Sequence, residues 1–188
     1  MDTYEGKQKL ALEIAQGSAA LDIIFAGLGW TPSALGTVLL QITSRLFFVF
    51  LIFPICPKAT ETDIAVGKFP WIQIAVFMWA ITEPVRSAFY AFKFARNGCI
   101  GDLRYNMFWI VYPLGVGAEM FSMWTTLASI RKKDIENRPF TYLMPNKVNF
   151  ELQFEYIIYI VFACYIVFFP VLYKLMIVQR KKFYEKKK

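Results

Sequence analysis

The chain has 188 residues, is 57% hydrophobic and 18% aromatic, and carries a formal net charge of +7 with no histidine and three cysteines. This composition excludes a Ser-His-Asp triad, an HExxH zinc site, a histidine general base and a disulfide framework. The apolar share exceeds the roughly 45–50% of an average soluble domain. We therefore predict an all-α, polytopic membrane helical bundle of about five transmembrane helices, with no metal and no cofactor.

Basic residues lie between the apolar segments and at the end of the chain, in residues 180–182 and 186–188. This distribution is typical of anchoring to anionic lipid headgroups and argues against nucleic-acid binding. We expect a polar N-terminus at residues 1–9, a single transmembrane domain at residues 10–178 and a basic cytoplasmic tail at residues 179–188. The N-terminus lacks the pattern of a cleaved signal peptide, so none is expected.

Residues 10–30 form the first apolar segment, which is either a marginal span or an interfacial helix because it contains Glu13, Gln16 and Asp22. Residues 34–53 form the second predicted span and carry Arg45 far from both ends. A cation inside a membrane should pair with an acid or bind an anionic ligand. Arg45 is therefore a candidate site residue, and snorkelling of its side chain is the alternative.

Residues 69–92 form the third predicted span, after a polar loop at residues 54–68. Glu83 and Arg86 are three residues apart, so they are neighbours on one helix surface. Within lipid such a pair neutralises itself locally. This structural interpretation and a functional one remain equally open.

Residues 103–124 form the fourth predicted span, which is long enough to cross a bilayer and contains Glu119. A carboxylate at the centre of a bilayer costs on the order of 2.5–3.5 kcal/mol or more. A helix that served only as an anchor would carry Leu or Phe at this position. We therefore expect Glu119 to be functional and to face the interior of the bundle.

Tyr112 lies seven residues before Glu119, so both side chains point to the same helix face about 10 Å apart along the axis. This separation suits two groups that act on opposite sides of a small reacting centre. Pro113 predicts a kink between them. Gly115 and Gly117 leave open surface for a neighbouring helix or a thin substrate chain. The alternative is a packing face with a snorkelling Tyr and an interfacial Glu.

Residues 150–178 form the fifth predicted span, after a hydrophilic connection at residues 129–147. The segment is apolar and aromatic, and Pro170 predicts a kink within it. Its acids, Glu151 and Glu155, lie at its entrance. We interpret this segment as scaffold.

Four stretches together resemble the very-long-chain (3R)-3-hydroxyacyl-CoA dehydratase family, also called protein tyrosine phosphatase-like proteins. They are QGSAALD (16–22), GTVLLQITSR (36–45), WAITEPVRSAFYAF (79–92) and LRYNMFWIVYPLGVGAE (103–119). The last stretch is the most specific, because Tyr-Pro-Leu-Gly is followed by Glu at the seventh position after Tyr. The resemblance covers most of residues 16–120.

The resemblance implies a six-span, multi-pass enzyme of the endoplasmic reticulum membrane that performs the third step of fatty-acid elongation. Such a lyase eliminates water from a 3-hydroxyacyl-CoA to give the trans-2-enoyl-CoA. The resemblance places Tyr112 and Glu119 on the family's catalytic pair. The resemblance also implies membrane lipid and other elongase-cycle enzymes as partners. It also places four residues on activity-sensitive positions, namely Arg45, Glu83, Arg86 and Gly115.

The chain departs from the family in lacking the first span, so five spans are expected where the family has six. A catalytically inactive scaffold of the elongase complex is the competing hypothesis, and a small-solute transporter is a third. A cysteine phosphatase is not expected, because its loop needs five residues between Cys and Arg. Cys99 and Arg104 are separated by only four.

Overall fold

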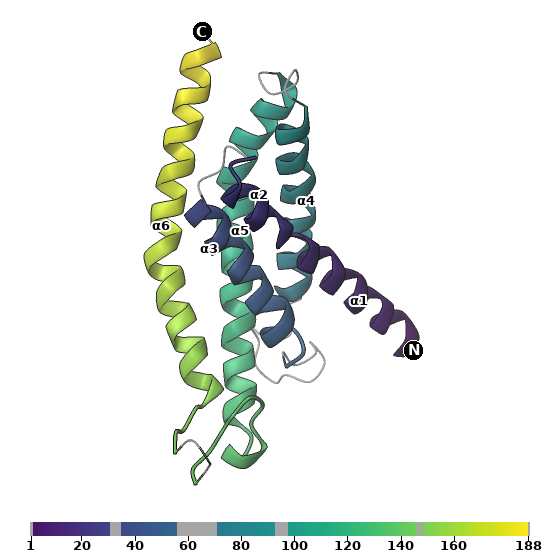
Figure 1. Cartoon of the computed structure of the whole chain (residues 1–188), viewed down its shortest axis with the longest axis vertical. Coiled ribbons are helices and arrows are strands. Elements are labelled where there is room, and N and C mark those ends of the chain that lie inside the picture. Colours follow the sequence, from purple (N-terminus) through teal and green to yellow (C-terminus); the bar gives the residue numbers. More distant parts are fainter. Residues whose placement is uncertain are drawn as a thin grey trace. The chain divides into compact units, whose positions relative to one another are not determined.

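The computed structural model describes residues 2–30, 35–55, 71–92, 98–145, 147 and 149–187 (Figure 1). Nearly all of this part is helical, and an isolated antiparallel bridge joins Tyr142 to Leu152. The all-α prediction is therefore confirmed. Two compact units divide the chain, Met1–Ile55 and Cys56–Lys188. Each unit is described separately.

The first unit contains α1 (Asp2–Ser18), α2 (Leu21–Gly27) and α3 (Leu35–Phe47), and α3 continues into a π-helical turn, η1 (Phe48–Ile52). Its small core is formed where α2 packs on α3, by Ala26, Val38 and Ile42 with Ala20, Ile23 and Leu46 around them. The predicted segment 34–53 thus corresponds to α3 and η1. The predicted segment 10–30 corresponds to part of α1 and to α2.

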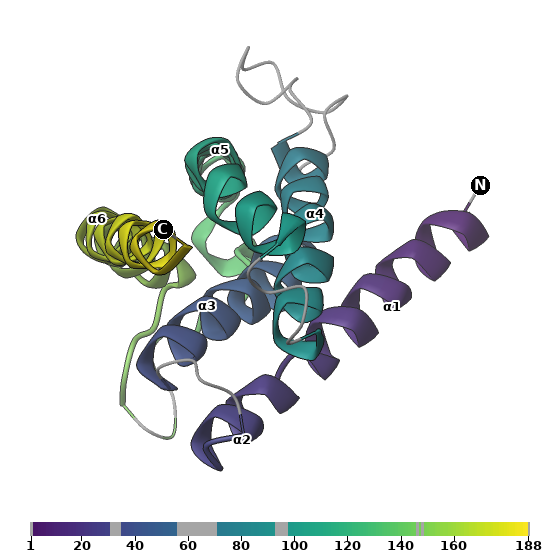
Figure 2. The ribbon, with the colours of Figure 1, turned by 90° about the horizontal axis from the view of Figure 1, so that it is seen from above.

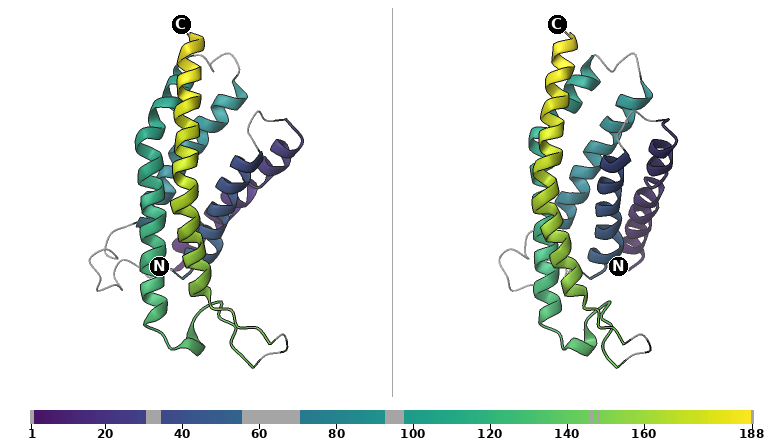
Figure 3. Two further views of the ribbon diagram at one scale, coloured as in Figure 1. Left: turned by 90° about the vertical axis from the view of Figure 1, so that its left-hand side faces the viewer. Right: turned by 60° about the vertical axis from the view of Figure 1, so that its left-hand side comes forward.

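The second unit contains α4 (Trp71–Ala91), α5 (Cys99–Arg131) and α6 (Phe154–Lys187). The helix α5 packs against both α4 and α6 (Figure 2). Consecutive helices run in opposite directions, so the start of α5 lies near the end of α6 (Figures 1 and 3). The connection between α5 and α6 contains a short 3₁₀ turn, η2 (Ile135–Asn137).

One face of α5 is buried along its whole length. The buried residues recur at intervals of three or four, which is the period of a helix face that packs on its neighbours. They include Tyr105, Phe108, Val111, Gly115, Ala118, Glu119, Ser122, Met123, Thr126, Leu127 and Ile130. Large apolar side chains such as Leu103, Ile110, Leu114 and Trp124 are exposed. The helix therefore has a packed face and an apolar outer face.

Two helical stretches of the described residues are long and apolar enough to cross a membrane, Leu10–Gly27 and Phe154–Lys187. Most of the second stretch is exposed, and its outer side chains are apolar. The polar residues within α4 and α5 lower the mean hydropathy of those helices. The arrangement of five spans stays a prediction.

The helices α5 and α6 extend beyond the predicted spans 103–124 and 150–178 at their polar ends. The described part of the predicted tail, residues 179–187, continues α6 as helix. Both helices also continue through their prolines, Pro113 and Pro170. Most of the predicted loop 54–68 falls outside the described residues.

Candidate functional site

The Glu119 carboxylate lies at the meeting point of three helices. Glu119 is on the buried face of α5, and only 6% of the residue is exposed. Its Oε1 accepts a hydrogen bond of 2.8 Å from the indole Nε1 of Trp79 on α4. Its Oε2 accepts a hydrogen bond from the phenolic hydroxyl of Tyr165 on α6. Each carboxylate oxygen is thus oriented by a donor from a different helix.

Gly115 sets the close approach of α4 to α5 one turn before Glu119. A Cβ atom at Gly115 would lie 3.6 Å from the Cβ atom of Met78, the residue that precedes Trp79. Small residues at a helix interface allow the backbones to come close. This approach brings the Trp79 indole within reach of the carboxylate. Trp79 is itself buried.

A column of buried hydroxyl groups follows Glu119 along α5. Ser122 donates to the carbonyl oxygen of Ala118 at 2.8 Å, and Thr125 and Thr126 donate to that of Ser122 at 2.9 and 2.8 Å. These bonds to the preceding turn satisfy hydroxyl groups that would otherwise be costly to bury. The column therefore has its polar groups paired within the helix.

Tyr112 is half-buried on the same helix, two turns before Glu119. Both lie within the continuous helix α5, for which the ideal rise per residue gives a spacing of about 10 Å. The structure therefore places both proposed catalytic residues on one helix. The catalytic roles of Tyr112 and Glu119 stay predictions.

Glu83 and Arg86 form an ion pair on α4. The Nε and Nη2 atoms of Arg86 both donate to Oε2 of Glu83, at 3.0 and 2.8 Å. The helices α4 and α5 are antiparallel (Figure 1). The part of α4 that follows Trp79 and carries this pair therefore runs toward the same end as the part of α5 that precedes Glu119. The local neutralisation predicted for this pair is observed, and its functional role stays a prediction.

Arg45 belongs to the first unit, in the last turn of α3, where its side chain is half-buried. Its predicted supporting role is not tested by the contacts around Glu119. Among the described residues, no group of three or more His, Cys, Asp or Glu side chains is placed to hold a metal ion.

Sequence reasoning missed two residues of this site. The apolar pattern of residues 150–178 indicates scaffold, yet the hydroxyl group of Tyr165 in this segment contacts Glu119. A phenol near the middle of an apolar span was the available signal. Trp79 lies within the stretch WAITEPVRSAFYAF, but an apolar aromatic residue there reads equally well as packing.

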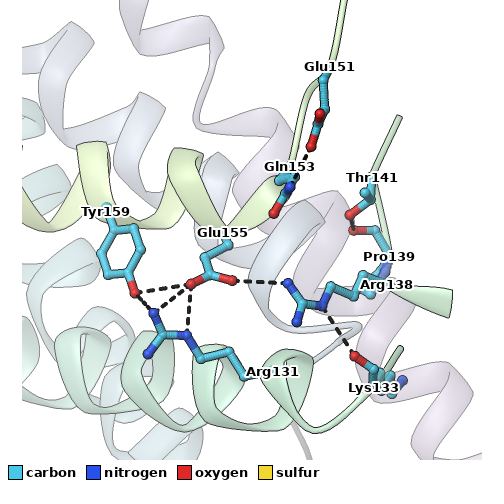
Figure 4. Close-up of polar contacts among 9 residues, drawn as sticks. All are labelled: Arg131, Lys133, Arg138, Pro139, Thr141, Glu151, Gln153, Glu155 and Tyr159. Atoms are coloured by element: carbon cyan, nitrogen blue, oxygen red, sulfur yellow. Dashed lines mark hydrogen bonds and ion pairs between the residues drawn. The ribbon is translucent and has the colours of Figure 1, made fainter. Parts of the chain in front are cut away.

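A polar cluster joins α5 to α6 at the end of α5 and the start of α6 (Figure 4). Glu155 accepts hydrogen bonds from Arg131 Nε at 2.7 Å and from Arg138 Nη1 at 3.2 Å. The hydroxyl group of Tyr159 contacts both Arg131 and Glu155. The hydrogen bond with Glu155 raises the pKa of Arg131. This cluster fixes the start of α6 against α5.

A second polar cluster joins the same helices at their opposite ends. Lys187 Nζ lies 2.6 Å from Asp102 Oδ2, and Asn106 bonds to both Tyr184 and Arg180, at 2.8 and 3.0 Å. The hydrogen bond from Lys187 lowers the pKa of Asp102. Asp102 and Arg131 are 29 residues apart, about 43 Å along a helix. A bilayer with its headgroups is about 40–45 Å thick.

The two clusters, the apolar outer faces and the buried carboxylate define an all-α protein with helices suited to a membrane. Residues 16–186 match the family described as protein tyrosine phosphatase-like protein, PTPLA. The chain belongs to this family. No solved structure matches it.

Curated relatives of the chain are named as dehydratases in animals and plants. Very-long-chain (3R)-3-hydroxyacyl-CoA dehydratase hpo-8 of Caenorhabditis elegans is 33% identical over 91% of this chain and 75% of its own length. Very-long-chain (3R)-3-hydroxyacyl-CoA dehydratase 1 of Mus musculus is 31% identical over 95% of this chain and 60% of its own length. Very-long-chain (3R)-3-hydroxyacyl-CoA dehydratase PASTICCINO 2 of Arabidopsis thaliana is 30% identical over 100% of this chain and 80% of its own length.

Proposed function

We propose that this chain is a very-long-chain 3-hydroxyacyl-CoA dehydratase, a carbon-oxygen lyase that eliminates water to give the trans-2-enoyl-CoA in the third step of fatty-acid elongation. The family and the names of the relatives support this activity. The observation that carries it in the structure is the buried carboxylate of Glu119, oriented by Trp79 and Tyr165.

The reaction requires removal of the proton alpha to the thioester and departure of the beta hydroxyl group. Positioned acid and base groups typically contribute about 10²–10⁴-fold each to such proton transfers. Glu119 and Tyr112 flank the second and third carbons of the substrate in this proposal, one handling the proton and the other the hydroxyl group. Arg45, Glu83, Arg86 and Gly115 have supporting roles in the same proposal.

The proposed setting is the endoplasmic reticulum membrane, which the chain crosses several times. Exposed apolar side chains on α6, such as Ile160, Ile166 and Val167, would be unfavourable in water and suit a lipid environment. The spacing of the two polar clusters supports α5 as a further span. The acyl chain of the substrate would lie among the apolar helices.

The test is reconstitution of the purified full chain in lipid with a long-chain 3-hydroxyacyl-CoA, following formation of the enoyl product. We expect Tyr112→Phe and Glu119→Gln each to lower kcat by about 10²–10⁴-fold, as is typical when an acid or base group is lost. Tyr156→Phe on the exposed side of α6 is the control and should have no effect.

Near-wild-type rates in both site variants would refute the assignment of the catalytic pair. A wild-type chain that folds but shows no elimination would refute the enzyme, and the inactive scaffold of the elongase complex would then replace it.

A further inference from the structure

We infer that Tyr165 is a positioning residue that works with Trp79 on Glu119, and that Glu119 exchanges its proton at Oε2, the oxygen that faces Tyr165. This inference rests on the proposed dehydratase function for its catalytic meaning. Its structural content, which is the hydrogen bond between Tyr165 and the carboxyl group of Glu119, can be tested without turnover.

The two donors to the carboxylate are chemically different. An indole N–H can only donate a hydrogen bond, so Oε1 must remain an acceptor as long as Trp79 contacts it. A phenolic hydroxyl group can donate or accept. When Glu119 becomes protonated, the proton therefore belongs on Oε2, and the Tyr165 hydroxyl group can turn to accept it.

This arrangement keeps the carboxyl group hydrogen-bonded in both of its protonation states. With the ionised form, Tyr165 donates to Oε2. With the protonated form, Oε2 donates to Tyr165, and the bond to Trp79 is unchanged. Glu119 can thus take or return one proton while both of its oxygens keep a hydrogen bond. The hydroxyl hydrogen of Tyr165, whose side chain is only partly buried, then turns away from Oε2.

Tyr165, a phenol in contact with the buried acid, comes from α6. Tyr112, the phenol that the sequence singles out, lies two turns away on the same helix as Glu119. The two phenols have separable roles in this inference: Tyr112 acts on the substrate, and Tyr165 orients Glu119. Both polar clusters at the ends of α5 and α6 keep α6 in the register that brings Tyr165 to Oε2.

The kinetic test compares Tyr165→Phe with Tyr156→Phe, the same chemical change at an exposed position of the same helix. We expect Tyr165→Phe to lower kcat by about 10–100-fold with little change in KM, because one hydrogen bond to a charged group is lost while substrate binding is retained. Tyr156→Phe should leave both constants unchanged. A wild-type kcat for Tyr165→Phe would overturn the inference.

The spectroscopic test does not need turnover. Infrared difference spectra across a pH titration record the C=O stretch of a protonated carboxyl group, and Glu119→Gln identifies the band of Glu119. We expect Tyr165→Phe to shift this band and Tyr156→Phe to leave it in place. An unshifted band would overturn the inference even in an active enzyme.

A shifted band in a chain without dehydratase activity would support the hydrogen bond between Tyr165 and Glu119 and refute only the proposed function. If Tyr165→Phe does not fold, 3-fluorotyrosine at position 165 retains the hydroxyl group and the side-chain size while changing the acidity of the phenol. This replacement should shift the Glu119 band, and the same replacement at position 156 should not. An unshifted band would again overturn the inference.

Discussion

Glu119 shows how one charged residue organises its surroundings in an apolar interior. Burying a carboxylate without partners is expensive, so its neighbours must supply hydrogen bonds. Trp79 and Tyr165 do so from two other helices. The same contacts that make the acid tolerable also fix its orientation, and this links the stability of the site to its chemistry.

Gly115 is predicted to tolerate one added methyl group but no long side chain. A Cβ atom would make an ordinary contact with Met78, so Gly115→Ala should keep most of the activity. Gly115→Leu must push α4 away from Glu119 and should lower elimination by about tenfold or more, because overpacking a core costs about 1–3 kcal/mol.

Gly117 provides the matched control, because nothing lies within 4 Å of a Cβ atom placed there. Gly117→Leu should therefore be tolerated. The measurements are the elimination rate and the thermal unfolding midpoint of each variant in detergent. If Gly115→Leu and Gly117→Leu had equal effects, the close approach of α4 to α5 at Gly115 would not be the reason for the loss of activity.

At the scale of elements, α5 and α6 are longer than their apolar segments because each supports the polar end of the other. Hydropathy marks the part of a helix that suits lipid and says little about where the helix ends. Side chains from the other helix contact these polar ends, as Lys187 does on Asp102 and Glu155 on Arg131. The helices α5 and α6 therefore behave as one paired element.

The contact between Asp102 and Lys187 should depend on pH. The pKa of Asp102 is lowered from 3.8 by its hydrogen bond with Lys187. Because the pKa of Asp102 is lower in the folded state than in the unfolded state, the contact stabilises the fold fully at a pH above the unfolded-state pKa. This stabilisation is lost as the pH falls through the folded-state pKa. The last turn of α6 should therefore loosen only in acid.

Hydrogen exchange in the last turn of α6, followed by mass spectrometry, checks this prediction. Protection should be constant at and above about pH 5 and should decrease below the ordinary Asp pKa. Asp102→Asn should show the loosened state at every pH. The effect should be small, because both side chains are more than one third exposed and ion pairs of this kind are weak. Unchanged protection in acid would contradict the prediction.

At the scale of the molecule, the two ends of the α5–α6 pair differ in charge. The start of α5 and the end of α6 have more cations than acids, with Arg104, Arg180, Lys181, Lys182, Lys186 and Lys187 against Asp102 and Glu185. At the other end, five cations (Arg131, Lys132, Lys133, Arg138 and Lys147) are nearly balanced by four acids (Asp134, Glu136, Glu151 and Glu155). Because positive residues favour the cytoplasmic side, we predict that the end of α6 faces the cytoplasm.

Cys99 offers a direct measurement of this orientation. It is exposed at the start of α5, the same end as the basic residues of α6. In a chain with Cys56→Ser and Cys164→Ser, a membrane-impermeant maleimide should label Cys99 in sealed microsomes without detergent. In a variant that lacks Cys99 and carries Glu136→Cys, the same maleimide should react only after the microsomes are permeabilised. The reverse pattern would establish the opposite orientation.

The amino-acid sequence by itself determined the helical class, the apolar segments and the position of Glu119 on a buried helix face. These features follow from local properties, because hydropathy and the cost of a buried charge can be evaluated from a short stretch of chain. The supporting roles proposed for Arg45, Glu83, Arg86 and Gly115 rest on charge or small size within apolar segments together with the family resemblance.

Only the tertiary structure decided which side chains meet Glu119. Trp79 and Tyr165 lie 40 and 46 residues from it in the chain, so no spacing rule connects them. The register between packed helices selects these contacts, because a shift of one residue rotates a side chain by about 100° and removes it from its partner. The partner of a tyrosine in an apolar helix, such as Tyr165, is therefore known only once the packing of that helix on its neighbour is known.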